Sequence, residues 1–482
     1  MSTAPLSTVI PATPLSDTER SAIRRVAFCY PPIPSDKGTP LLSQNRQFQW
    51  FSHPTAIYPV VPASAATLLK ARGYEVLWLD GIARAFTPDA FWETLTAWQP
   101  DCIFLETKTP VVAFHWQWAA ELKRRLPHCR LVMAGDHVTA LPEETFKATP
   151  VDALLKGGDY DFALLSWLEG RDIPVDLATL PRIDRALTRW QDYAYRNGNF
   201  ARTPGAYLMS ARDCWHGKCT FCSWTTLYPT YRIRPVEDVL DEIGALIQLG
   251  VREIMDDAGS LPVGQWLTDF CHGMIARGYH KQVRLDCNLR FGALSAETYR
   301  LMRRAGFRLV LFGVESANQA TLDKLNKGLT IQAIREGAAA ASAAGLDVHI
   351  TLMFGYPWET REDAERTVQL GREFLRTGVA ATLQATWLVP YPGTPLYREL
   401  EASGQLLTQD WSRYDMRSPV MRSPLSENDI RACIAATYRG FLHPFAILRQ
   451  LRRALGHPAY LFRGAAALIG HLRDFVQRSP EK

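Results

Sequence analysis

Short apolar runs alternate with stretches of helical periodicity over the first third of the chain. Each run has the length of a buried strand, and a helical stretch such as Ala63–Arg72, closed by Gly73, separates one run from the next. This order predicts a parallel sheet with helices on both faces, so we expect residues 25–170 to form one Rossmann-like α/β domain. The predicted strands cover residues 25–30, 74–80, 102–106, 130–135 and 151–156.

Strand–helix alternation continues in the second half of the chain. Residues 1–24, rich in Ser, Thr and Pro, predict a flexible leader, and residues 171–204 predict a linker. Between residues 205 and 410 six strand–helix units favour a partial (β/α)6 barrel of the TIM type, in which ligands gather at the carboxyl ends of the strands. Residues 411–482 are predicted to be helical. The barrel strands are expected at 206–210, 253–255, 283–286, 308–312, 348–353 and 382–387.

Composition and charge exclude several classes of protein. Hydrophobic residues make up 47% of the chain and charged residues 21%, as in a globular protein. Nine cysteines in 482 residues are too few for a disulfide-built scaffold, and no apolar run approaches the ~18 residues that cross a bilayer. The first residues lack the pattern of a secretory signal, so we expect a cytoplasmic location. A net charge of +5 is too small to indicate nucleic-acid binding.

Three of the cysteines lie within nine residues, just after a predicted strand: Cys214, Cys219 and Cys222. Thiolates this close on one loop can serve one centre, as iron–sulfur clusters and soft metals require. Three ligands leave a coordination position open, whereas a closed zinc site needs four. The loop therefore favours a three-cysteine cluster. The alternatives are zinc with His216 as the fourth ligand, or three unrelated buried thiols.

This loop resembles the cysteine loop of the radical S-adenosylmethionine (SAM) enzymes. Four and then two residues separate the cysteines here, whereas the family most often has three and then two, and Thr220-Phe221 matches the family well. The resemblance implies that Cys214, Cys219 and Cys222 hold a [4Fe-4S] cluster with one iron free to chelate the amino and carboxylate groups of SAM. It also implies that Phe221 lies beside the adenine ring.

Two later segments lie where barrel strands should end. Asp256-Asp257 resembles the segment that meets the amino group of SAM, although two carboxylates on a solvated turn would look the same. Asn288 and Arg290 follow the third strand, where they could hold the SAM carboxylate or ribose. Arg290 could equally form a structural pair with Asp257.

Further segments match the family in order along about 200 residues. Gly313-Val-Glu315-Ser316 closely resembles its Gly-Val-Glu-Ser block, which makes Glu315 and Ser316 candidate cofactor-binding residues. Three more segments agree with it but consist mostly of turn formers: 324–328, 355–360 and 390–395.

The N-terminal domain resembles the cobalamin-binding (B12-binding) module of one radical SAM subgroup. Glycine-containing loops at strand ends would let a flat macrocycle approach the backbone. The Asp-x-His-x-x-Gly loop that places a histidine under cobalt is absent, and His137 lies outside such a motif. Cobalamin binding and an empty scaffold both remain open. The matching segments are 30–32, 59–62, 134–138 and 156–159.

The C-terminal region combines apolar residues with many arginines. Such a basic amphipathic segment can cap a barrel, which is the commoner role, or contact an anionic membrane, which would fit a lipid-like substrate. The arginines are Arg439, Arg449, Arg452, Arg453, Arg463 and Arg473.

These resemblances imply a B12-dependent radical SAM enzyme, most simply one that C-methylates a natural-product, lipid or tetrapyrrole precursor. The first alternative is a radical SAM cyclase, ring-rearranging or oxygen-inserting enzyme without methyl transfer. The second is a non-catalytic cobalamin- or metal-binding protein. An electron donor such as flavodoxin or ferredoxin is implied. No catalytic side chain is assigned beyond the cluster ligands, and Cys287 is a weak candidate for quenching a radical.

Overall fold

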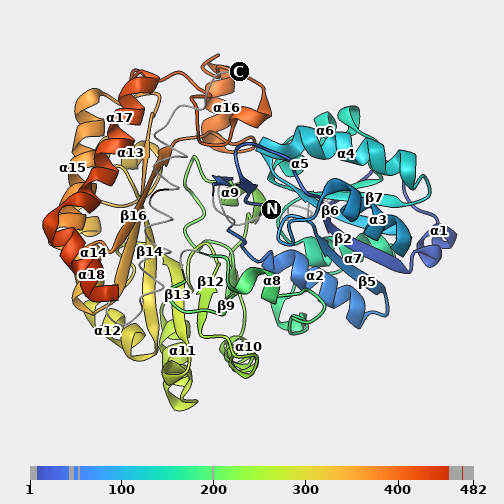
Figure 1. Ribbon diagram of the computed structural model, residues 1–482, viewed down its shortest axis with the longest axis horizontal. Helices are drawn as coiled ribbons and strands as arrows, with labels where there is room; N and C mark the ends of the chain where they lie inside the picture. Colours follow the sequence, from blue (N-terminus) through green and yellow to red (C-terminus); the bar gives the residue numbers. More distant parts are fainter. Residues whose placement is uncertain (1–7, 43–47, 53–54, 198–199, 455–468, 470–482) are drawn as a thin grey trace, which may run out of the picture.

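The computed structural model describes residues 8–42, 48–52, 55–197, 200–454 and 469. Two α/β units lie side by side in the described chain (Figure 1). The first, in blue to cyan, is built around one six-stranded sheet, and the second, in green to orange, is built around another. This arrangement confirms the predicted fold class.

All five strands predicted for the N-terminal domain are present. The sheet order is β1-β8-β7-β6-β2-β5, in which every neighbouring pair except β1·β8 is parallel. The chain order therefore reverses between β2 and β6, which makes this point the topological switch of a doubly wound sheet. The strands are β1 Val9–Pro11, β2 Arg25–Tyr30, β5 Glu75–Asp80, β6 Cys102–Thr107, β7 Arg130–Gly135 and β8 Ala153–Leu155.

Helices cover both faces of this sheet because successive side chains of a strand point to opposite sides. Val26 and Phe28 belong to one apolar core with residues of α2 and α7, while Ala27 and Cys29 belong to another with residues of α3 and α4. The helices of this domain are α2 Val60–Ala71, α3 Pro88–Trp98, α4 Val112–Arg125, α5 Asp136–Ala140, α6 Pro142–Ala148 and α7 Tyr160–Glu169, with the 3-10 turn η1 Thr109–Val111.

The leader expected over residues 1–24 is wrong for its second part. β1 pairs antiparallel with β8, and α1 (Asp17–Ala22) begins at a capping box formed by Ser16 and Glu19. The strand covers a sheet edge that would otherwise expose unpaired backbone groups. A strand of three residues is too short to produce a readable periodicity. Residues 1–7 lie outside the described chain.

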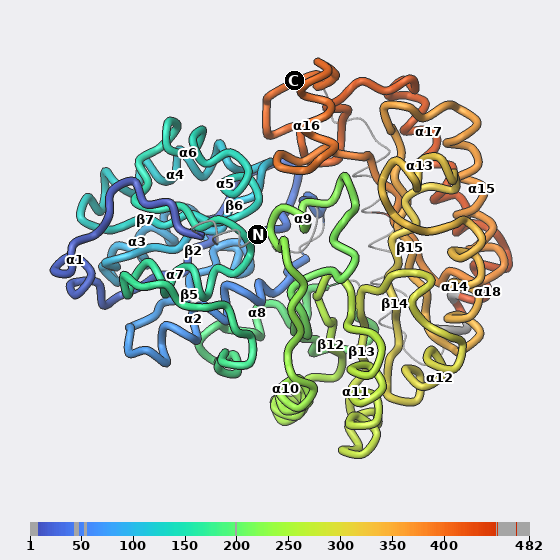
Figure 2. Tube along the Cα trace, turned by 180° about the vertical axis from the view of Figure 1, so that it is seen from behind, coloured from blue at the N-terminus to red at the C-terminus, as the bar shows by residue number. Residues whose placement is uncertain are grey.

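The second unit is the predicted partial barrel. Its six strands are all parallel and lie in chain order, from β9 to β16. Figures 1 and 2 show helices α10, α11, α12, α14 and α15 along the outer side of this curved sheet. The strands are β9 Gly205–Leu208, β12 Glu253–Asp256, β13 Arg284–Leu289, β14 Phe307–Glu315, β15 Asp347–Phe354 and β16 Thr382–Trp387.

Helix starts in the barrel follow local capping rules. The Ser295 hydroxyl accepts a hydrogen bond from Thr298 N at the start of α12, and Thr360 with Asp363 forms a capping box at the start of α15. The barrel helices are α10 Val236–Gln248, α11 Gln265–Ala276, α12 Ala296–Arg304, α13 Gln319–Lys324, α14 Ile331–Ala343 and α15 Arg361–Thr377. Short elements complete this part: η2 Leu177–Thr179, α8 Gln191–Ala194, β10 Ala211–Arg212, α9 Trp224–Leu227, β11 Arg232–Ile233 and η3 Tyr279–Lys281.

The segment after β16 returns to the N-terminal domain. Trp411 Nε1 donates to Glu144 Oε1 at 2.9 Å, and Lys37 pairs with Asp415 at 2.6 Å. Lys37 precedes a hairpin of β3 (Thr39–Pro40) and β4 (Trp50–Phe51), from which Gln49 also bonds to Gln384 on β16. Loops of the N-terminal domain are therefore joined to β16 and to the segment that follows it.

Helices follow in the described part of the C-terminal region, as predicted. α17 and α18 pack against α15 on the outer side of the barrel. No helix in the described chain is long and apolar enough to cross a membrane. The elements are α16 Pro395–Ala402, η4 Trp411–Arg413, α17 Glu427–Tyr438, η5 Arg439–Leu442 and α18 Pro444–Ala454.

Candidate active site

The three clustered cysteines lie on the loop that follows β9 and β10, at the carboxyl end of the barrel. Cys214, Cys219 and Cys222 are all partly exposed and in no disulfide, whereas Cys29 and Cys271 are examples of the buried thiols elsewhere. Burial raises the pKa of the Cys219 thiol, and the neighbouring Cys214 raises it further. Burial likewise raises the pKa of Cys222, with smaller contributions from Cys219 and Cys214. The three thiols thus lie within electrostatic reach of one another.

Backbone groups of the 324–328 segment hold this loop in place. Thr220 N donates to Leu325 O at 3.0 Å, and the Thr220 hydroxyl donates to Lys324 O at 3.3 Å. His216 Nε2 donates to Asn326 O at 2.7 Å, which ties the imidazole to the same segment. The resemblance noted for residues 324–328 therefore has a structural basis.

The arrangement of possible ligands bears on the choice between a zinc ion and an iron–sulfur cluster. Among the described residues, no group of three or more His, Cys, Asp or Glu side chains is arranged to hold a single metal ion. A zinc ion needs its ligands at one point, whereas a cubane binds each thiolate through a different iron. Three neighbouring, partly exposed thiols on one loop fit a three-cysteine cluster.

Two cations lie beside the cysteine loop. The Arg290 guanidinium is 5.7 Å from the centre of the Trp215 ring, and burial lowers its pKa while the Cys219 and Cys214 thiolates act to raise it. After burial, Lys327 and Arg290 are the next largest influences on the pKa of Cys219, and both lower it. Cations beside thiols favour the thiolate form that iron requires. Arg290 thus lies next to the proposed cluster.

Three carboxyl groups gather near the same loop. Asp256 Oδ1 accepts hydrogen bonds from Ser210 N and Ala258 N, both at 3.1 Å, and Asp213 accepts one from Gly259 N. Burial raises the pKa of Asp256 to about 6, and burial with Asp257 and Asp256 nearby raises that of Asp213 well above its usual range.

The aspartates do not lie on a solvated turn, since Asp256 and Asp257 are only 8% and 1% exposed. Buried carboxyl groups this close favour a bound cation such as an ammonium group. Sequence reasoning missed Asp213, although it directly precedes Cys214.

The predicted Gly-Val-Glu-Ser block organises the neighbouring strand end. Glu315 accepts from Lys327 Nζ at 3.0 Å and from the Thr351 hydroxyl at 3.2 Å. A Cβ on Gly313 would overlap the Glu315 carboxylate, which explains the glycine. Glu315 thereby holds the Lys327 ammonium group near Cys219, a role for Lys327 that the sequence did not single out. Ser316 is fully buried, and its hydroxyl accepts from Asn318 N at 3.2 Å.

Asn288 and Phe221 occupy opposite kinds of environment. Asn288 is partly exposed, and its Nδ2 donates to Ala258 O at 2.9 Å beside the aspartates. Phe221 packs in an apolar cluster that includes Tyr356 and Leu396. Cys287 is fully buried in the apolar core that also contains Cys271 of α11 and Tyr299 of α12. This places Cys287 toward the outer helices and makes it a poor candidate for quenching a radical.

A second group of buried polar residues lies at the carboxyl edge of the N-terminal sheet. Tyr30 OH donates to Glu106 Oε2 at 2.8 Å, and Tyr193 OH donates to Asp80 Oδ2 at 2.5 Å. Burial raises the pKa of Glu106 to about 8 and that of Asp80 to about 6. Glu106 Oε1 is buried and has no hydrogen-bond partner among the described residues.

A small pocket and an unpaired polar atom lie near the topological switch. The pocket has a volume of about 40 Å³ and is lined by Tyr30, Pro59, Asp80 and Tyr193 among others. Tyr30 connects it with Glu106, whose unpaired oxygen is a polar group that a ligand rich in amides, such as cobalamin, would satisfy. His137 is fully buried between the rings of Trp116 and Trp411, a structural placement that agrees with its lying outside a cobalt-ligating motif.

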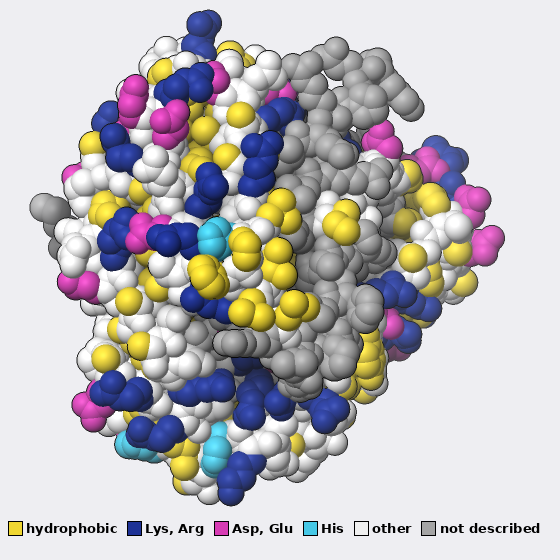
Figure 3. Space-filling model, turned by 60° about the vertical axis from the view of Figure 1, so that its left-hand side comes forward, with side chains coloured by type: hydrophobic (Ala, Val, Ile, Leu, Met, Phe, Trp, Pro, Cys, Tyr) yellow, Lys and Arg dark blue, Asp and Glu magenta, His cyan; other side chains and the backbone are white. Residues whose placement is uncertain are grey.

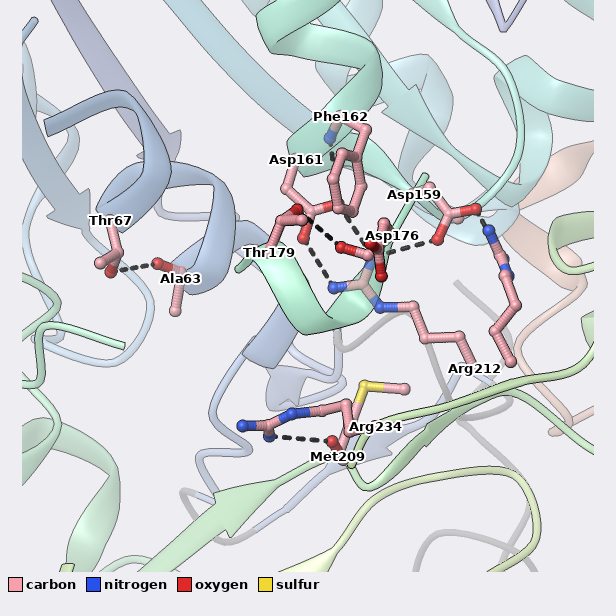
Figure 4. Close-up of polar contacts among 12 residues, drawn as sticks. Ala63, Thr67, Asp159, Asp161, Phe162, Asp176, Thr179, Met209, Arg212 and Arg234 are labelled. Atoms are coloured by element: carbon pink, nitrogen blue, oxygen red, sulfur yellow. Dashed lines mark hydrogen bonds and ion pairs between the residues drawn. The ribbon is translucent and has the colours of Figure 1, made fainter. Parts of the chain in front are cut away.

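An ion-pair cluster joins the two units beside the cysteine loop (Figure 4). Arg212 Nη1 donates to Asp159 at 3.0 Å and to Asp161 at 2.8 Å, and its Nη2 donates to Asp161 at 2.6 Å. Arg232 pairs with Asp159 at 2.7 Å. Because Arg212 lies two residues before Cys214, this cluster sets the position of the cysteine loop relative to the N-terminal sheet.

Comparison with known proteins agrees with this geometry. The model of the radical SAM superfamily matches residues 209–371. An uncharacterized methyltransferase of Pyrococcus horikoshii is 26% identical over 453 residues, covering 87% of this chain and 94% of the relative. An anaerobic magnesium-protoporphyrin IX monomethyl ester cyclase of Cereibacter sphaeroides is 25% identical and covers 85% and 70%. A hopanoid C-3 methylase of Methylococcus capsulatus is 24% identical and covers 75% and 72%.

Solved structures share the whole arrangement. The cobalamin-dependent SAM radical enzyme OxsB, solved with aqua-cobalamin and SAM, has a TM-score of 0.65 at 14% identity and covers 94% of this chain and 72% of its own. The radical SAM methyltransferase TsrM of Kitasatospora setae, solved with cobalamin and a [4Fe-4S] cluster, has a TM-score of 0.63 at 16% identity and covers 87% and 89%. Residues 209–371 therefore match the radical SAM superfamily, and the chain as a whole shares the two-unit fold of OxsB and TsrM.

Proposed function

We propose that the protein is a B12-dependent radical SAM enzyme that cleaves SAM reductively and functionalises an unactivated carbon. The favoured reaction is C-methylation of a natural-product, lipid or tetrapyrrole precursor. The observation that carries this proposal is the grouping of three thiols, two cations and three buried carboxyls at one end of the barrel. The relatives named methyltransferase and methylase, which align with 87% and 75% of the chain, support methyl transfer.

Different residues of the chain would bind the cluster, SAM and cobalamin. Cys214, Cys219 and Cys222 would hold the [4Fe-4S] cluster. When bound, cluster and SAM supply a carbon radical at deoxyadenosine, and cobalamin supplies the methyl group. The protein positions these groups and excludes water from them.

Two regions of opposite charge would orient SAM. Asp256 and Asp257, joined by Asp213, would hold its ammonium group, and Arg290 would bind its carboxylate. Asn288, next to the aspartates, remains a proposed contact to the ribose.

The remaining predicted residues support these contacts. Phe221 remains a proposed neighbour of the adenine ring. Glu315 acts through Lys327, and we now propose that Ser316 positions the turn after β14.

The proposal is tested with protein reconstituted without oxygen. Incubation with SAM and a strong reductant is expected to yield 5′-deoxyadenosine, and a variant with all three loop cysteines changed to alanine is expected to yield none. Iron and cobalt counted in the same sample should show both metals in the wild type and loss of iron alone in the variant. Equal deoxyadenosine from both proteins would overturn the proposal.

The Cereibacter relative supports an alternative reaction in which a ring forms without methyl transfer. S-adenosylhomocysteine distinguishes the two, because cobalamin must be remethylated by a second SAM only if a methyl group is transferred. Its formation together with deoxyadenosine supports methylation. Deoxyadenosine alone favours the cyclase alternative, and neither product indicates a protein that only binds cofactors.

We also propose peripheral membrane contact through α18. Leu442, Phe445, Ile447, Leu448 and Leu451 are large apolar residues that are all more than 40% exposed. Figure 3, which brings the side of α15, α17 and α18 forward, shows hydrophobic side chains gathered there with Lys and Arg around them. An apolar strip with basic neighbours fits the surface of an anionic bilayer. Arg463 and Arg473 lie outside the described residues.

We also propose that a protein electron donor reduces the cluster. Flavodoxin or ferredoxin is the class of donor that reductive SAM cleavage requires, and the cysteine loop is partly exposed to receive the electron.

A further inference from the structure

A pocket separate from the cysteine loop opens at the rim of the barrel. It has a volume of about 420 Å³ and lies between the ends of β15 and β16, the start of α17 and the segment 407–425. We call it the rim pocket. Its size is in the range of small-molecule sites. Its lining residues are Gly355, Trp387, Leu388, Leu407, Pro419, Val420, Met421, Arg422, Ser423, Leu425, Glu427 and Ile430.

Buried apolar residues form the inner wall of the rim pocket. Trp387, Leu388, Val420, Met421 and Ile430 are each at most 3% exposed. Walls of this kind are suited to an apolar ligand.

Polar groups interrupt the apolar lining at Trp387, Arg422, Ser423 and Glu427. Trp387 Nε1 is buried and has no hydrogen-bond partner among the described residues. Arg422 is exposed, and no described residue pairs with its guanidinium. The nearby Glu427 carboxylate already accepts hydrogen bonds from Arg431 at 2.8 and 2.9 Å, so it does not neutralise Arg422. The pocket therefore offers a positive charge and a buried donor to a ligand that is otherwise apolar.

The rim pocket and the cysteine loop border the same apolar cluster. Leu388 and Met421 line the pocket and also belong to the apolar cluster of Phe221. Cys219 and Cys222 pack against that same cluster. Met421 is a flexible side chain that can change rotamer at low cost. A ligand in the rim pocket would thus reach toward the reacting centre past Leu388 and Met421.

We propose that the rim pocket binds the apolar body of an amphipathic anionic substrate, with its acidic group at Arg422 and its hydrocarbon part directed toward Leu388 and Met421. This deepens the proposed function, on which it rests, by naming the substrate class. It also fits the chemistry, because radical chemistry is needed where the target carbon has no activating group nearby. The acidic group can be a carboxylate or a phosphate.

Binding is tested directly with the reconstituted protein. The probes are a fluorescent long-chain carboxylate and its methyl ester, and a long-chain alkyl phosphate is the competitor. We expect Arg422→Gln to weaken binding of the carboxylate about tenfold and to leave binding of the ester unchanged. Leu407→Trp, at a lining residue that is 49% exposed, should narrow the mouth and weaken both probes. Val420→Trp should abolish both. Arg300→Gln, an exposed arginine on α12, is the matched control and should change neither.

Three results would overturn the proposal. They are full probe binding by Val420→Trp, equal losses of carboxylate binding in Arg422→Gln and Arg300→Gln, and a wild-type protein that binds no probe. Stronger competition by the phosphate than by an unlabelled carboxylate assigns the acidic group to a phosphate. The same titrations in the triple-cysteine variant should be unchanged. A wild-type protein that binds the probe but forms no deoxyadenosine would therefore count against the proposed function alone.

Discussion

Replacing Arg212 by methionine tests whether the two units are held together by a buried ion pair. Arg212 and Asp161 are 4% and 0% exposed, and two hydrogen bonds of 2.8 and 2.6 Å join them. Removing one partner of a buried pair costs about 3–5 kcal/mol, because the other charge stays buried without compensation. Asp161 keeps one backbone donor, Phe162 N at 3.0 Å, and Asp159 keeps Arg232. We therefore expect a loss of about 3 kcal/mol in the free energy of unfolding.

Urea unfolding at neutral pH measures this change, with limited proteolysis within residues 171–204 as a probe of separation between the units. The double variant Arg212→Met/Asp161→Leu removes both charges and is expected to recover most of the loss. The matched control is Arg335→Gln, whose partner Glu373 is 40% exposed and whose loss should cost under about 1 kcal/mol. A single variant that loses less than about 1 kcal/mol, or a double variant no more stable than the single one, would refute the reasoning.

Three further predictions follow from individual groups. In the wild type, burial raises the pKa of Glu106 to about 8, so its ionisation becomes more costly and the free energy of unfolding should fall as pH rises from 4.5 to 8. Glu106→Gln should abolish this fall. Thermal unfolding of wild type and variant across pH checks the prediction. Gly313→Ala should push Glu315 off Lys327 and lower the iron content after reconstitution, and an iron content equal to the wild type would count against this account. Phe445→Ser with Leu448→Ser should reduce co-sedimentation with anionic vesicles several-fold, whereas a loss that also appears with neutral vesicles would exclude the electrostatic part of the argument.

Local sequence patterns were sufficient for the strands and for the cysteine loop. The strands buried on both faces, such as β2 and β6, are continuous apolar runs, and a run of that kind is visible without knowing its neighbours. The loop cysteines are likewise close in sequence. β1 was missed because its stability comes from pairing with β8, and no local signal records a partner.

The contacts that shape the site join residues far apart in the chain. Arg212 and Asp161 are 51 residues apart, and Trp411 and Glu144 are 267 apart. Burial also changed how single residues should be interpreted. Asp256 could be placed at a strand end, but only its burial shows that it needs a cation.

Two groups of residues with opposite charge lie beside the cysteine loop, and this asymmetry limits what can bind between them. Asp213, Asp256 and Asp257 are buried together, so ionising all three is unfavourable until a cation joins them. Arg290 and Lys327 lie near Cys219, so that group favours anionic ligands and thiolates. A ligand carrying both an ammonium group and a carboxylate satisfies the two groups at once, whereas a simple cation or anion satisfies only one. The same asymmetry fixes the ligand's orientation, since turning it around would bring like charges together.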